Sequence, residues 1–140
     1  MKKNMIISVV LMAASTIGLQ RAAADDFDDV TTVVEKYFSG TEDGRPDLLK
    51  EAFLPSLEIQ SVGTNGSLRR LTAEDYIGRF QVGKKANRKG RIVSMDVVGT
   101  AASVKAEIVM GERLYTDYLL LLKLADGWHV TNKIATWRQK

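Results

Sequence analysis

The chain has 140 residues, of which 45% are hydrophobic and 26% charged, and it contains no cysteine. This size and composition suit one folded domain with one core, and the lack of cysteine excludes disulfide bonds and a lipid-modified N-terminal cysteine. The formal net charge of +3 arises in residues 1–24, which hold three basic residues and no acidic one. Without them Lys plus Arg falls from 20 to 17, equal to the 17 Asp plus Glu. A nucleic-acid-binding protein that relies on long-range charge attraction is therefore not expected.

The beginning of the chain has the layout of a secretory signal. Positive residues at 2–3 are followed by an apolar run over 5–19 and by small residues that end at Ala24. The apolar run is shorter than the roughly 20 residues that cross a membrane, so a retained anchor is the less favoured alternative. We expect residues 1–24 to be a signal peptide that is cut after Ala24. Residues 25–140 are then a single periplasmic or secreted domain, free of the membrane once the signal is removed.

Three helices are predicted in the first half of this domain. Apolar residues recur at spacings of three and four between residues 26 and 40, with acidic residues in the first turn. Pro46 suits the start of a second, short helix, which Pro55 stops. Thr72 is a helix cap with an acidic residue three positions later, and it begins a third helix that ends at Gly83.

The remaining segments alternate between apolar and polar residues, which predicts strands. Two short strands flank the turn dipeptide Asn65-Gly66 as a hairpin. A basic loop over residues 84–91 follows, and a run of like charge between elements is usually solvated. Short turns then separate four long strands, which indicates an antiparallel meander. Helices gathered on one face of a curved sheet make an α+β domain. The four long strands are predicted at residues 92–98, 103–110, 114–124 and 128–137.

Several segments carry a family resemblance. The stretches Val33–Phe38, Asp47–Phe53 and Leu57–Ile59 resemble the opening of the nuclear transport factor 2-like superfamily. The ending, Asp117–Lys123 followed by Asp126–Lys133, is similar to the closing hairpin of its "putative lumazine-binding" branch, and SnoaL-like proteins are also similar. The resemblance spans nearly all of the exported part. It implies a cystatin-like cone, in which an antiparallel sheet wraps around three helices and an apolar pocket, and a homodimer through the outer sheet face.

Ketosteroid isomerase, an enzyme of this fold type, provides a comparison for catalysis. It uses a tyrosine and a protonated aspartate as hydrogen-bond donors and a second aspartate as general base. Tyr37 matches the tyrosine, and Asp117 matches the first aspartate within about one residue. Ser61 stands where the base is expected, and serine does not accept a proton near neutral pH as a carboxylate does. If Asp117 acts with Tyr37, it must point into the cone within hydrogen-bonding reach of the phenol.

The last two predicted strands have one apolar and one mixed face. The mixed face carries Asp117 and Lys133, which lie diagonally across the hairpin, together with Leu119, Leu121 and other residues. The apolar face is assigned Leu120, Leu122, Leu124, Trp128, Val130 and Ile134. Polarity predicts that the mixed face points outward, whereas the comparison with the isomerase points Asp117 inward. Polarity is the preferred criterion here.

The single histidine, His129, does not indicate a metal site, because such a site needs three or four convergent ligands. It also lacks an evident nucleophile partner, so a position on the surface or in an interface is expected.

Three function hypotheses follow. The leading one is an exported domain that binds a small apolar or aromatic ligand, without cofactor or metal and with no assured catalytic activity. The second is a proton-transfer or dehydratase enzyme that uses Tyr37 and Asp117. The third is a dimeric interaction module of the cell envelope. The residues expected to line the pocket are Tyr37, Phe53, Ile59, Tyr76, Phe80, Met95 and Tyr118.

Overall fold

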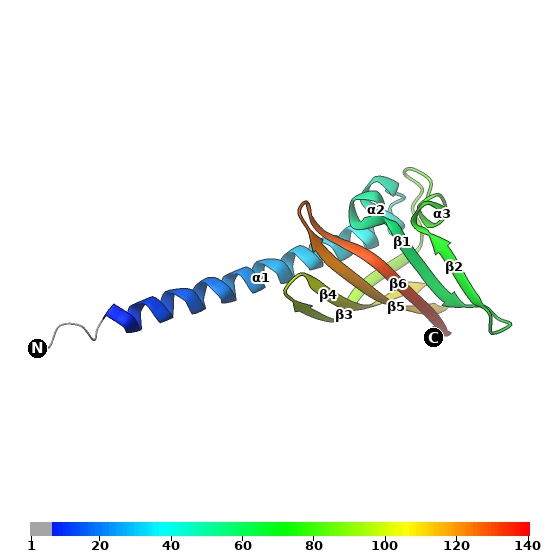
Figure 1. The fold of residues 1–140 in the computed structure, drawn as a ribbon. Coiled ribbons are helices and arrows are strands. Elements are labelled where there is room, and N and C mark those ends of the chain that lie inside the picture. The colour runs from blue at the N-terminus through cyan, green and yellow to red at the C-terminus, as the bar shows by residue number, and fades with distance from the viewer. Residues whose placement is uncertain (1–6) are drawn as a thin grey trace, which may run out of the picture.

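The computed structural model describes residues 7–140, with side chains from residue 24 onward, as an α+β domain with one long N-terminal helix (Figure 1). The charged start of the expected signal, Lys2 and Lys3, lies outside the described residues. The elements in chain order are α1 (Ile7–Glu42), α2 (Pro46–Ala52), β1 (Phe53–Val62), β2 (Leu68–Thr72), α3 (Ala73–Ile77), β3 (Arg88–Val98), β4 (Ala101–Met110), β5 (Arg113–Leu124) and β6 (Gly127–Gln139).

Helix α1 is longer than the sequence pattern predicts, because it runs without a break from the expected signal segment into the domain. Its first turns extend away from the sheet, and its last turns pack against it (Figure 1). Val30, Val34 and Tyr37 are fully buried there at helical spacing. Within residues 7–140, no helix combines the length and the apolar character that crossing a membrane requires.

The six strands form one curved sheet in the order β2-β1-β6-β5-β4-β3 (Figure 1). The predicted hairpin and the predicted four-stranded meander are both confirmed as antiparallel pairs. The two units join through a parallel pairing of β1 with β6. The predicted basic loop is shorter than expected, because β3 begins at Arg88 and pairs with the end of β4. Backbone pairing at a sheet edge requires no apolar side chains, so polarity alone misplaced this boundary.

A close contact between α1 and β3 fixes the helix on the sheet. A Cβ atom added at Gly90 would lie 2.3 Å from Cδ1 of Phe38, which is itself buried. Only glycine therefore allows β3 to approach the ring at this distance.

The prediction about the faces of β5 and β6 is wrong for Asp117 and Lys133. Both point inward, with 1% and 4% of their surface exposed, whereas Leu120 and Ile134 are more than half exposed on the outer face. Thr131 is an extra residue in β6, since Leu120 pairs with Asn132 and Leu121 pairs with Val130. This bulge shifts the alternation, so Trp128, Val130 and Lys133 all face the core although their sequence spacing forbids it in a regular strand.

Candidate functional site

Three polar side chains meet in the middle of the core. The hydroxyl of Tyr37, on α1, donates a hydrogen bond of 2.6 Å to Oδ2 of Asp117, on β5. The ammonium of Lys133, on β6, donates to the Tyr37 hydroxyl at 2.6 Å and lies 2.8 Å from Oδ2 of Asp117. All three have less than 5% of their surface exposed. We call this closed set the buried triad.

The buried triad is electrically balanced inside the core. Burial and the neighbouring Asp117 carboxylate hold the pKa of the Tyr37 phenol well above its usual value, so the phenol stays protonated. Burial by itself lowers the pKa of Lys133. The attraction of Tyr76 and Asp117 outweighs that effect, and the pKa is raised. The ammonium also lies 4.7 Å and 4.9 Å from the ring centres of Tyr37 and Tyr76, within the range of a cation–π interaction. A charge pair thus persists in the core because rings and hydrogen bonds surround it.

A row of aromatic rings leads from the buried triad to the surface. Tyr37 contacts Phe53 with 5.5 Å between ring centres, Phe53 contacts Tyr76 at 6.1 Å, and Tyr76 contacts Phe80 at 5.3 Å. These separations are those of favourable aromatic pairs. The inner end of the row is filled by these side chains, since Tyr37 has no exposed surface.

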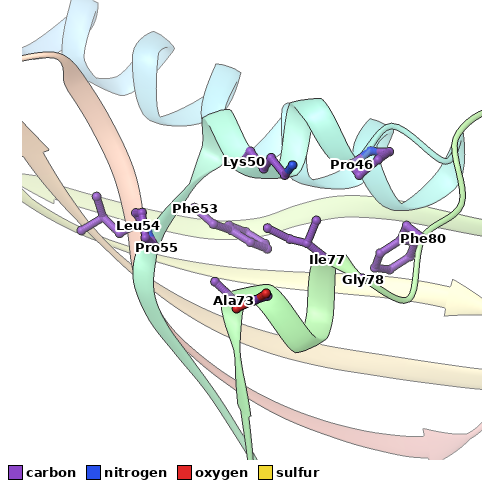
Figure 2. Close-up of a pocket in the computed structure, with 10 residues that line it drawn as sticks. Pro46, Lys50, Phe53, Leu54, Pro55, Ala73, Ile77, Gly78 and Phe80 are labelled. Atoms are coloured by element: carbon purple, nitrogen blue, oxygen red, sulfur yellow. The ribbon is translucent and has the colours of Figure 1, made fainter.

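The outer end of the row borders a hollow between α2, the start of β1 and α3. Phe53, Ile77 and Phe80 face the space between the two helices (Figure 2). The hollow has a volume of about 650 Å³, within the usual range for small-molecule sites. We call it the α2–α3 hollow, and its lining residues are Pro46, Lys50, Phe53, Leu54, Pro55, Ala73, Glu74, Ile77, Gly78 and Phe80.

The other residues expected in the pocket are distributed differently. Ile59 is buried in the core, and Met95, on β3, is partly buried and packs against the core. Neither residue lines the α2–α3 hollow. The prediction for Tyr118 is wrong: it is 49% exposed on the outer face, because the adjacent Asp117 takes the inner one. Ser61, at the position of the expected base, lies near the far end of β1 in a second hollow.

His129 lies near the β5–β6 turn with about one sixth of its side chain exposed. Its Nδ1 is 3.2 Å from the carbonyl oxygen of Glu51, and its Nε2 is 3.2 Å from a carboxylate oxygen of Asp126. Among the described residues, no group of three or more histidine, aspartate or glutamate side chains could hold a metal ion.

Sequence reasoning identified Tyr37 and Asp117 and named Lys133 as a diagonal neighbour of Asp117, but it placed the lysine on the surface. The sequence of β5 contains no signal that corrects this, because both faces carry leucines, Leu119 and Leu121 on one and Leu120 and Leu122 on the other, and only the structure shows that the first pair is buried. Once Asp117 is placed between α1 and the sheet, its charge requires a cationic partner, and Lys133 supplies it.

Comparison with known proteins identifies the family. Residues 25–136 match the model of the family described as "Putative lumazine-binding". The chain belongs to this family. No curated protein matches this chain.

Solved structures confirm the fold of this family member as nuclear transport factor 2-like. A protein from Shewanella baltica OS155, described as NTF2-like and of unknown function, is 22% identical with a TM-score of 0.75, over 84% of this chain and 97% of that one. An NTF2-like protein from Methylobacillus flagellatus KT is 27% identical with a TM-score of 0.71, over 81% and 93%. A third, from Novosphingobium aromaticivorans, is described as having a cystatin-like fold and is 12% identical with a TM-score of 0.66, over 86% and 87%.

Proposed function

We propose that this protein is an exported domain that binds a small apolar or aromatic molecule in the α2–α3 hollow. The observation that carries the proposal is the outer part of the aromatic row, where the half-buried Phe80 and the edge of the buried Phe53 border a space of about 650 Å³. Aromatic walls with a few polar groups at the rim are typical of small-molecule sites. Here Lys50 and Glu74 are those polar groups.

The expected cut after Ala24 is compatible with the contacts at the new N-terminus. Asp26, the second residue after the expected cut, bonds the Lys123 ammonium and accepts a hydrogen bond of 3.2 Å from the Trp128 indole. The hydrogen bonds from Lys123 and Trp128 lower the pKa of this carboxyl group. A domain that begins at Asp25 therefore keeps its first turn attached to the sheet.

Binding is favoured over catalysis because the buried triad satisfies itself. The Tyr37 hydroxyl donates its only proton to Asp117 and also accepts from Lys133, so it has no donor left for the oxygen of a substrate. The enzyme hypothesis required Asp117 to point inward within reach of Tyr37, and this geometry is present. It also required a group to move the proton, and Ser61 does not supply a carboxylate.

Native mass spectrometry of protein purified from its own cell envelope tests the proposal. A retained small molecule is expected on the wild type. It should be lost in Ile77→Trp, whose larger ring fills the α2–α3 hollow. The matched control is Val82→Trp, at a position that is 84% exposed outside the hollow, and this variant should keep the molecule. A wild type without any bound molecule, or an Ile77→Trp protein that retains it, would contradict the proposal.

A second proposal is a homodimer through the outer face of the sheet. Tyr118, Leu120, Leu122 and Ile134 are each between 42% and 55% exposed on that face, and Val98 is 71% exposed. A cluster of exposed apolar side chains on one sheet face is typical of an interaction surface. Light scattering should give the mass of a dimer for the wild type and of a monomer for Leu120→Lys. The control Val82→Lys, at an exposed position outside the sheet, measures the effect of an added charge alone and should stay dimeric. A monomeric wild type would refute the dimer.

A further inference from the structure

A second hollow lies at the other end of the sheet, where the β1–β2 turn and the C-terminal end of β6 come together (Figure 1). Its volume is about 480 Å³, and it shares no lining residue with the α2–α3 hollow. We call it the arginine hollow. Its lining residues are Ser61, Val62, Gly63, Thr64, Arg69, Leu71, Arg79, Arg113, Tyr115, Ala135, Thr136 and Trp137.

Three arginines from three different segments converge on this hollow. Arg69 comes from β2, Arg79 from the residues that follow α3, and Arg113 from the start of β5. Among the side chains of residues 24–140, none of the three forms an ion pair, and neither an acidic residue nor a lysine lines the hollow. The hollow is therefore uniformly positive.

Other arginines among residues 24–140 differ in whether they are paired: Arg88 and Arg138 also form no ion pair, whereas three others each bond a carboxylate. Arg45 bonds Asp47 and Arg91 bonds Glu107. Arg70 follows Arg69 directly on β2, points to the opposite face and bonds Glu58 at 2.9 Å. Arg70 therefore has a carboxylate partner, whereas the adjacent Arg69 has none.

The position of Ser61 explains why Arg69 has no partner. The two residues are directly opposite each other on β1 and β2. An acidic side chain at residue 61 would face Arg69 and neutralise it, since opposite charges on directly paired strand positions attract. The serine leaves the charge of Arg69 available.

An aromatic surface lies beside the arginines. The Arg113 guanidinium stacks over the Trp137 ring at 4.4 Å from its centre, which fixes the orientation of the guanidinium. Trp137 is nevertheless 48% exposed, and its cross-strand partner Tyr115 also lines the hollow. An oriented guanidinium next to an exposed indole suits a ligand that has both a charge and a ring.

We propose that the arginine hollow binds a small aromatic anion, with its carboxylate on Arg69 and Arg113 and its ring against Trp137 and Tyr115. Arg79 adds positive charge at the rim. A guanidinium and a carboxylate form two parallel charge-assisted hydrogen bonds, the strongest polar contact that a partly exposed site offers. This is a second binding site, separate from the α2–α3 hollow. Because the two hollows share no lining residue, binding in one does not depend on binding in the other.

Titration of the full chain with 2-naphthoate tests the proposal, with the uncharged 2-naphthamide as the probe that lacks the anion. Calorimetry gives the dissociation constant, and the indole N–H signals in an NMR spectrum locate the ligand, since the chain has two tryptophans. We expect naphthoate to bind at least about tenfold more tightly than naphthamide, the size of one charge-assisted hydrogen bond. The indole signal of Trp137 should move and that of the buried Trp128 should not.

Substitutions of single residues test which arginines bind the carboxylate of naphthoate. Arg69→Gln and Arg113→Gln should each weaken naphthoate binding about tenfold, and Ser61→Asp should do the same by neutralising Arg69. Arg70→Gln, the adjacent arginine on the opposite face, should leave the dissociation constant unchanged, and so should Ile77→Trp in the other hollow. Equal affinity for naphthamide, an equal loss in Arg70→Gln, or an unmoved Trp137 signal at millimolar naphthoate would each overturn the proposal.

Discussion

Replacing Lys133 by methionine removes the cation of the buried triad and leaves the Asp117 carboxylate inside the core with one hydrogen bond, from Tyr37. Removing one partner of a buried ion pair costs about 3 to 5 kcal/mol. The remaining hydrogen bond places this case near the lower limit, so we expect a loss of about 3 kcal/mol from an unfolding free energy of about 5 to 15 kcal/mol. The midpoint of thermal unfolding should fall by roughly 10 °C.

Urea unfolding followed by circular dichroism measures this loss, with the free energy extrapolated linearly to water. Lys123→Met is the matched control, because Lys123 pairs with Asp26 at the surface and its loss should be much smaller. The triple variant Tyr37→Phe, Asp117→Leu, Lys133→Met removes every polar group of the triad together. It should recover most of the stability, since apolar residues of similar volume often replace a buried ion pair without loss.

Two results would refute this reasoning. The first is a Lys133→Met protein as stable as Lys123→Met, which would mean that the core tolerates the Asp117 carboxylate without its cation. The second is a triple variant less stable than Lys133→Met, which would mean that the three side chains do not act as one compensated set.

Three further predictions follow from the same contacts. The first concerns pH: the pKa values of Tyr37 and Lys133 are raised in the folded state, so their contribution to stability is complete below the pKa of the unfolded chain, about 10. This contribution is lost as the pH rises toward the pKa values of the folded state. Urea unfolding from pH 8 to about 11 should therefore show a steeper loss of stability for the wild type than for the triple variant. Gly90→Ala should lower the unfolding free energy by about 1 to 3 kcal/mol because its Cβ overlaps Phe38, and an unchanged urea midpoint would contradict the packing of α1 on β3. Deletion of residues 1–24 should leave the urea midpoint of the domain unchanged, and a lower midpoint would show that the first turns of α1 stabilise the domain.

The periodicity of the chain was sufficient to predict most of the fold. Apolar spacings of three and four gave the last part of α1 and the whole of α2, and alternation with glycine-containing turns gave the four strands of the meander. These features are local, so each short stretch of sequence contains the information for them. The start of β3 at Arg88 and the parallel pairing of β1 with β6 depend on strands that are distant in the sequence. No local sequence pattern therefore predicts them.

Only the tertiary structure decided which side of the sheet became the core. Alternation divides β5 into a face with Asp117 and a face with Leu120, but it does not say which of them meets the helix. Tyr37 from α1 and Lys133 from β6 approach Asp117 and compensate its charge, so the face with the acid is the buried one. The Thr131 bulge then allows Trp128, Val130 and Lys133 to share that face. The sequence thus determined the elements and the polar residues, while contacts between distant segments set the direction in which each side chain points, because burial of a charge depends on where its partner lies in space.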